Sequence, residues 1–124
     1  MKYLILLYAA PDARPVPGTP ESAAEHQAWM TYTMDMIQAG VHRGGDALHG
    51  IETATTIREV GGSLASTDGP FAETKETLGG YYLIDVPDLD TALEWAGRAP
   101  IVKYGAAEVR PLMVFDDIPS TAGA

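Results

Sequence analysis

Cysteine is absent from the 124-residue sequence. Its absence excludes disulfides, thiolate nucleophiles and cysteine-ligated zinc together. It also fits a reducing compartment, and we expect the protein to be cytoplasmic. Basic residues are scarce as well, because eight Lys and Arg stand against seventeen Asp and Glu, for a formal net charge of −9. A surface this acidic repels phosphate backbones, so we expect no nucleic-acid partner.

Long apolar runs are missing too. The opening run over residues 1–10 is shorter than the roughly 20 residues that cross a bilayer, so we expect no membrane association. Pro11, Asp12 and Arg14 follow it where a signal peptide would carry a small-residue cleavage site, and we interpret the run as a buried strand. The motifs HExxH, GxGxxG, GxSxG and the P-loop are absent, which leaves the standard zinc-protease, nucleotide-binding and serine-hydrolase functions without support.

What remains is the composition of an ordinary globular domain. Hydrophobic residues make up 46% of the chain and charged residues 20%, which is typical of folded proteins rather than disordered ones. For 13.2 kDa, surface scaling predicts about 6,400 Å² of exposed surface in a compact fold. We expect one domain over residues 1–116 and a flexible C-terminal tail over residues 117–124.

The predicted elements follow in the order strand, helix, strand, hairpin, strand, helix, strand. Runs of β-favouring residues predict strands over residues 2–10, 54–60, 63–67, 81–86 and 108–115. A short strand is also expected inside the glycine-rich stretch 41–50, and one loose helical turn over residues 71–78. Gly61 and Gly62 form a two-residue hairpin signal.

Two helices are expected from capping residues and apolar spacing. The first begins between Thr19 and Ser22, where Ser22 with Glu25 has capping-box spacing, and it ends at Gly40. Its inward face is expected to carry the apolar residues that recur at helical spacing: Met30, Met34 and Ile37. The second helix is capped by Asp88. Its apolar stripe consists of Leu89, Ala92, Leu93 and Ala96.

This order is a βαββαβ plan with an inserted β-hairpin, which is the ferredoxin-like α+β arrangement. Right-handed crossovers place both helices on one face of the sheet. The strands over residues 2–10 and 81–86 are nevertheless apolar on both faces. The second face therefore needs a cover, and the simplest one is the same face of another copy. We expect a homodimer whose sheets pack back to back.

A longer motif then suggests a family. Residues 67–80 read TDGPFAETKETLGG, followed by YYLIDVPDLDTALEWAGRAP and later by AEVRPL. This resembles the DGPF subfamily of the YCII-related proteins, nearly from end to end. The motif positions are held by Asp68, Gly69, Pro70, Phe71, Glu73, Lys75, Glu76 and Gly79. The resemblance implies a ferredoxin-like dimer of the dimeric α+β barrel superfamily.

The resemblance implies less about activity, because the family has no settled reaction and a fold alone cannot supply one. Some YCII-like relatives are proposed enzymes that use a His–Asp pair. Members of the DGPF subfamily are often encoded beside extracytoplasmic-function sigma factors, which implies a possible protein partner.

The motif segment concentrates ionisable side chains at the end of a predicted strand. Asp68 or Glu73 would act as a general base, and Lys75 would stabilise developing negative charge. Phe71 and Glu76 would then contact a small-molecule ligand. The structural alternative stays open: Asp68 caps the turn, Phe71 fills the core and Glu73 pairs with Lys75 on the surface.

Other candidates lie outside the motif. His26, one turn before Met30 on the expected inward stripe, would act as a general base in a cleft, or else be a histidine near water. Tyr81 follows two glycines and is a candidate ligand-binding residue. Trp29, Trp95 and Tyr82 either line a pocket for an aromatic substrate or pack in the core and dimer interface.

His42, Asp46 and His49 have the residue types of a metal site. Gly44 and Gly45 disfavour a helix there, and on a strand Asp46 and His49 would fall on opposite faces. We therefore expect neither a metal nor another cofactor.

The sequence thus predicts a small-molecule-binding protein or small enzyme that uses acid/base residues near the DGPFAETKE loop. The alternative is a non-catalytic accessory dimer associated with an extracytoplasmic-function sigma-factor system, whose acidic surface meets a basic partner.

Overall fold

The computed structural model describes residues 1–116, and the predicted tail lies outside the described residues. The elements are β1 (Lys2–Ala9), α1 (Pro20–Gln38), β2 (His42–Ala47), η1 (Ile51–Thr53), β3 (Thr55–Val60), β4 (Ser63–Asp68), β5 (Thr77–Asp85), α2 (Leu89–Gly97), η2 (Pro100–Lys103) and β6 (Ala106–Pro111). Over this range no helix combines the length and the apolar character needed to span a membrane.

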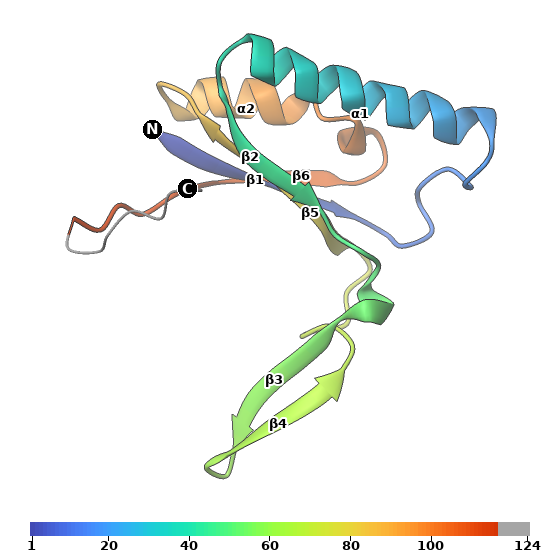
Figure 1. Ribbon diagram of the computed structural model, residues 1–124, viewed down its shortest axis with the longest axis vertical. Coiled ribbons are helices and arrows are strands. Elements are labelled where there is room, and N and C mark those ends of the chain that lie inside the picture. The colour runs from blue at the N-terminus through green and yellow to red at the C-terminus, as the bar shows by residue number, and fades with distance from the viewer. Residues whose placement is uncertain (117–124) are drawn as a thin grey trace.

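Four strands form one antiparallel sheet in the order β2-β5-β1-β6, and β3 pairs only with β4 in a separate ribbon. With that ribbon set aside, the order is the ferredoxin-like one, so the predicted α+β fold with an inserted hairpin is confirmed. Figure 1 shows α1 and α2 on the same face of the sheet, as the crossover rule requires.

The core lies between this face and the helices. Along β1 every second side chain is buried, and the same alternation continues on β5 at Ile84. The buried hydrophobic residues are Tyr3, Ile5, Leu7, Ala9, Tyr32, Met36, Ile84, Val86, Ala92, Ala96, Ala99 and Ile101. The intervening residues of β1, including Leu4 and Leu6, face the other side of the sheet and are only half-buried.

The predicted inward face of α1 is wrong. Met30, Met34 and Ile37 are each about half exposed, and the helix instead buries Tyr32 and Met36. Both sets have helical spacing, so periodicity alone favours the more apolar one. The buried set prevails because Tyr32 donates a hydrogen bond to the Trp95 carbonyl (2.8 Å) and joins an aromatic cluster above the sheet. On α2 the alanines are buried while Leu89 and Leu93 stay half exposed.

Three local predictions also need correction. The N-cap of α1 is Thr19, whose hydroxyl accepts from the Ser22 amide (3.2 Å), so Ser22 is not the cap. Residues 71–76 form bends without a helical turn, because β5 already begins at Thr77. The last strand ends at Pro111, which has no amide hydrogen to extend the ladder. The cap at Asp88 is confirmed by a 2.9 Å bond from the Thr91 amide.

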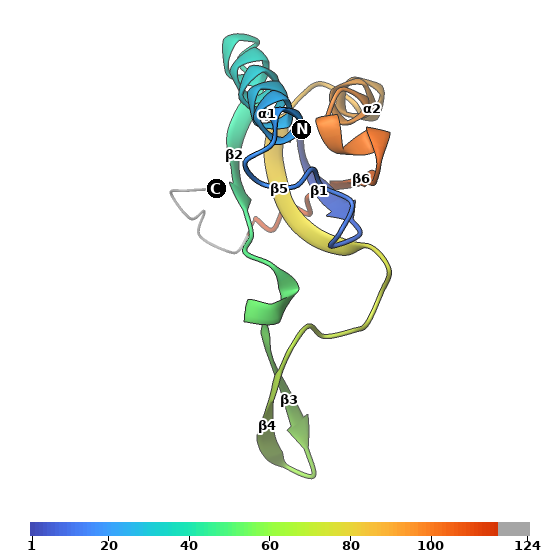
Figure 2. The same ribbon diagram turned by 90° about the vertical axis from the view of Figure 1, so that its right-hand side faces the viewer.

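The hairpin β3–β4 extends from the body as an arm, defined here as residues 55–68. Figures 1 and 2 show it pointing away from the sheet and helices in both views. The accessible surface of the chain is 8695 Å², about a third more than the roughly 6,400 Å² of a compact monomer. The exposed surface is thus larger than the value predicted from mass, and the arm contributes to the excess because all its side chains except Thr56 are exposed.

Two methionines on α1 test the corrected helix orientation. Met36→Ala should lower the free energy of unfolding by about 2–5 kcal/mol, because Met36 is fully buried. Met34→Ala, the matched control 47% exposed on the same helix, should change it by about 0.5 kcal/mol or less. Urea denaturation followed by tryptophan fluorescence measures both. Equal losses would contradict the orientation.

Burial raises the pKa of the Tyr32 phenol, and the neighbouring Tyr82 adds to the effect. In the unfolded chain the tyrosine ionises near pH 10, whereas in the folded protein it ionises only at higher pH. The free energy of unfolding should therefore fall as the pH rises past 10. Tyr32→Phe should cost about 1 kcal/mol at pH 7 through the lost hydrogen bond. Denaturation curves at pH 10 to 11.5 should show a smaller difference in the free energy of unfolding between wild type and this variant than at pH 7. A gap that stays constant with pH would refute the assignment.

Candidate functional site

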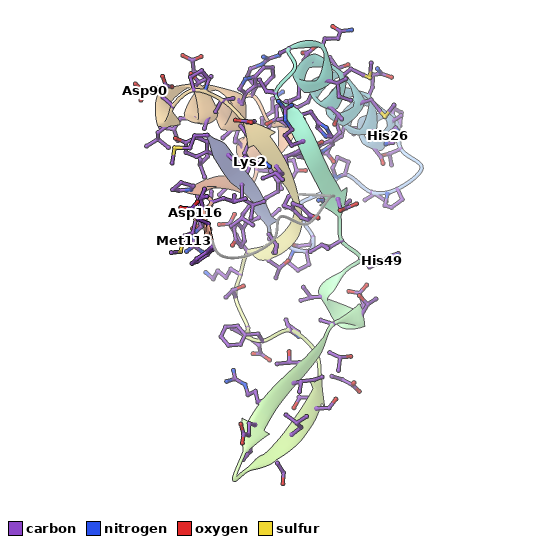
Figure 3. The ribbon with its side chains drawn as sticks, turned by 60° about the vertical axis from the view of Figure 1, so that its left-hand side comes forward. Lys2, His26, His49, Asp90, Met113 and Asp116 are labelled. Atoms are coloured by element: carbon purple, nitrogen blue, oxygen red, sulfur yellow. The ribbon has the colours of Figure 1, made fainter. Side chains whose placement is uncertain are left out.

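A pocket of about 360 Å³ lies at the edge of the sheet where α1 passes β2 and β5. The lining residues are Leu7, Arg14, His26, Trp29, Thr33, His42, Gly45, Asp46, Ala47, Gly79, Gly80, Tyr81 and Tyr82. In Figure 3 His26 lies on α1, and His49 lies where β2 leads into the arm. The pocket thus joins segments that are far apart in the sequence.

The floor of the pocket depends on how closely β2 approaches β5. A Cβ on Gly45 would lie 2.7 Å from the Tyr81 carbonyl oxygen, and one on Gly80 would lie 2.9 Å from the Asp46 carbonyl oxygen. Both distances are too short for a real side chain, so glycine is needed on both strands. The register then sets Gly45 opposite Tyr82 and Asp46 opposite Tyr81.

Aromatic rings form one wall. The ring planes of Trp29 and Tyr82 are 14° apart with centroids 6.4 Å apart, and the His42 ring meets Tyr82 edge-on at 6.0 Å. A 2.6 Å hydrogen bond joins the hydroxyls of Tyr82 and Thr33, which ties β5 to α1. These contacts orient the rings along the pocket.

Polar and charged groups surround this wall. Arg14 reaches the pocket from the loop before α1, where its Nη2 atom lies 3.0 Å from the position of a Cβ built on Gly79. His26 and His42 add two imidazoles. The Tyr81 hydroxyl donates to Asp46 Oδ2 (2.7 Å), and this hydrogen bond, with the charge of the carboxylate, raises the pKa of Tyr81.

Two of the residues predicted from the sequence line this pocket, namely His26 and Tyr81. His26 is exposed rather than buried on an inward stripe, because the stripe to which it belongs faces outward. Successive residues of a strand point to opposite faces, so the Tyr81 side chain lies on the face of the sheet away from Tyr82, where its hydroxyl is bound to Asp46.

The other predicted residues lie elsewhere, at the end of β4 and in the loop that follows it: Asp68, Phe71, Glu73, Lys75 and Glu76. All five are exposed, and none lines the pocket. Phe71 does not fill the core, since its ring is 73% exposed with the Arg58 guanidinium 4.9 Å from its centroid. In the described chain no ion pair joins Glu73 to Lys75. The catalytic and ligand-binding roles of the five stay predictions.

Comparison with known proteins places the chain in a family. The family model described as the YCII-related domain matches residues 1–116. The chain belongs to the YCII-related domain family. An uncharacterised protein of Rhizobium meliloti (strain 1021), R00369, is 47% identical over 64 residues. That match spans 50% of this chain and 52% of the relative, so it covers about half of the relative's length.

A solved structure supports the fold of this YCII-related protein. It is 5-chloro-2-hydroxyhydroquinone dehydrochlorinase (TftG) from Burkholderia phenoliruptrix AC1100, in complex with 2,5-dihydroxybenzoquinone. The TM-score is 0.52 at 14% identity, over 91% of this chain and 94% of that one. At that identity the likeness shows a shared fold and no more. Membership of the DGPF subfamily stays a prediction.

The three residues considered as a metal set do not come together in this YCII-related chain. His42 and Asp46 line the pocket, whereas His49 lines a neighbouring cavity beside Glu52. Among residues 1–116, no three His, Asp or Glu side chains are placed to hold a metal ion.

Sequence reasoning missed Arg14 and Thr33 as pocket residues. Arg14 lies in a proline-rich loop without periodicity, so nothing local indicates where its side chain points. The available signal was that a lone cation precedes a helix in a chain with few basic residues. Thr33 is adjacent to the buried Tyr32, and its position could be inferred only once the helix orientation was known.

The Asp46–Tyr81 pair can be tested by titration. Asp46→Asn removes the negative charge that opposes ionisation of the phenol, so Tyr81 should ionise at lower pH than in the wild type. Absorbance at 295 nm between pH 8 and 12 measures this shift, as a difference against a Tyr81→Phe titration. Asp90→Asn, on α2, is the control. Superimposable curves for wild type and Asp46→Asn would show that the pair does not form.

Proposed function

We propose that this YCII-related protein binds a small planar aromatic anion in the pocket between α1, β2 and β5. One observation supports this most directly: a guanidinium and two imidazoles adjoin a wall of stacked aromatic rings. The rings suit a flat ligand, and Arg14 suits an ionised hydroxyl or carboxylate on that ligand.

The electrostatics of the chain strengthen the argument. The formal net charge is −9, so most of the surface repels anions. Arg14 is one of only eight Lys and Arg residues in the sequence, and it lies at this pocket. A cation in such surroundings would distinguish an anionic ring from a neutral one of the same shape.

The pocket also holds groups that move protons. An imidazole accepts or donates a proton near neutral pH, and His26 is exposed at the mouth. We propose that His26 exchanges a proton with a ring hydroxyl of the ligand, while Arg14 and the rings of Trp29 and Tyr82 hold the ligand in place.

The structural neighbour lends support to this ligand class. It is named as a dehydrochlorinase and was solved with 2,5-dihydroxybenzoquinone, a planar ring with two hydroxyls. For the chain described here, we propose acid/base chemistry on such a ring in this pocket. The sequence analysis instead predicted that chemistry near the DGPFAETKE loop. A cytoplasmic location and the alternative of an accessory dimer in a sigma-factor system stay predictions.

We further propose that the protein is a homodimer through the open face of its sheet. The helices cover one face only, while Leu4 and Leu6 on β1 and Leu83 on β5 are directed to the other. β6 adds Glu108 opposite Leu6 and Arg110 opposite Leu4. A second copy suits this face, because a two-fold axis brings apolar side chains together and offers each charge an opposite partner.

Calorimetric titration of two probes tests the ligand class. At pH 7, 2,5-dihydroxybenzoquinone should bind and neutral 1,4-dihydroxybenzene should bind at least tenfold more weakly. Arg14→Gln should weaken binding of the first probe by about tenfold or more, because a hydrogen bond to a charged group is lost.

Arg98→Gln provides the matched control, since Arg98 bonds Asp35 at 2.7 Å and does not line this pocket. Its affinity for the probe should equal that of the wild type. Equal weakening by both arginine variants, or equal binding of both rings, would refute the proposal.

A further inference from the structure

Apart from the Arg58 guanidinium over the Phe71 ring, the arm formed by β3 and β4 has no packing partner among the described residues. Neither strand has more than marginal contact with any other described element. Its apolar side chains are open to water, with Leu64 80% and Ile57 65% exposed. A two-stranded ribbon is at best marginally stable in water, and independent stability takes three or more strands or a packing surface. The arm therefore needs a partner.

The exposed surface of the chain is larger than that of a compact monomer of the same mass. The excess over a compact monomer is about 2,300 Å². A specific interface of standard size buries about 800 Å² on each side. The excess thus exceeds the area that one such contact buries on each chain, and the exposed arm contributes to it.

Hydrogen bonding within the arm shows which backbone groups are available. The Gly69 amide donates to the Ala54 carbonyl (2.7 Å), so residues 54 and 69 are a bonded pair. In an antiparallel ladder bonded and non-bonded pairs alternate, and the register pairs 55 with 68 and 57 with 66 without a shift. The amides and carbonyls of Leu64, Ser66 and Asp68 therefore point away from β3, along the outer edge of β4.

The two edges of the arm differ in protection. Natural edge strands are guarded by charge, proline or a bulge. β3 carries Arg58 and Glu59 in its second half, whereas β4 reads SLASTD, with no proline, no bulge and one charge at its end. The edge of β4 is the unguarded one.

Charge favours a second copy as the occupant. Two chains of −9 repel each other over most of their surfaces. The arm is an exception, because its charged residues are only Arg58, Glu59 and Asp68. Contact through β4 thus brings two identical acidic proteins together where repulsion is weakest.

We infer that the β4 edges of two copies pair antiparallel about a two-fold axis at Ser66. Ser66 then faces Ser66 of the second copy, and Leu64 faces Asp68 of the second copy. All the outward amides and carbonyls of these three residues form bonds, and two marginal ribbons become one four-stranded sheet. This contact is separate from the open sheet face and does not depend on the ligand pocket.

The cysteine-free sequence allows a direct test. A bonded antiparallel pair has its Cα atoms about 5.5 Å apart, which suits a disulfide. Ser66→Cys should therefore give a covalent dimer on mild oxidation. Ser63→Cys, the matched control on the same strand, should not, since its two copies would lie about 20 Å apart. Equal yields from the two variants would overturn the inference.

A second pair of variants tests the hydrogen bonds. Ser66→Pro removes an outward amide hydrogen while the bonds between β4 and β3 remain, and Ser66→Ala keeps it. Sedimentation equilibrium should give a mass for Ser66→Pro that is at most half that of Ser66→Ala. Equal masses would overturn the inference, as would a Ser66→Ala mass equal to that of a single chain.

Discussion

The direct approach of the β2 and β5 backbones is the constraint on which the candidate site depends. Gly45 and Gly80 leave no room for a side chain between the two strands. Because neither glycine has a Cβ atom, the two strands can approach closely in the register that pairs Asp46 with Tyr81. The His42 ring then meets the Tyr82 ring edge-on. A larger residue at either position would separate the strands, and the pocket floor would separate with them.

The aromatic cluster connects β5, at the pocket floor, to α1 and so fixes the orientation of that helix. Tyr82 bonds Thr33 and stacks with Trp29, while Tyr32 bonds the carbonyl of Trp95 on α2. These contacts explain why α1 buries its tyrosine face instead of its methionine stripe. They also bring His26 to the pocket mouth. The packing of the core and the composition of the site are therefore two results of one helix orientation.

The protein consists of a compact body, formed by the four-stranded sheet and the helices, and the arm formed by β3 and β4. The body carries the pocket, in which a cation and two imidazoles lie in an otherwise acidic protein. Most of the motif by which the sequence resembles the DGPF subfamily lies between the arm and β5, and of its residues only Gly79 and Gly80 line that pocket. Assembly would give this arm a role that a single chain cannot show, because a two-stranded ribbon with open edges is incomplete.

Much of the fold follows from the sequence alone. The alternation along β1, the Gly61-Gly62 turn and the Asp88 cap depend on neighbouring residues, so local chemistry identifies them. The ferredoxin-like order then follows from the succession of elements. His26 and Tyr81 line the pocket, whereas the sequence assigned them to a cleft shared with Asp68, Glu73 and Lys75, so their functional roles stay predictions.

The tertiary structure decided the rest. Which of two helical stripes faces the sheet depends on ring packing and on a hydrogen bond between Tyr32 and Trp95, which are 63 residues apart. Arg14 reaches the pocket through a loop whose course no periodicity describes. The sequence determines elements because their causes are local, whereas the pocket joins residues from 7 to 82 and exists only where those segments meet in space.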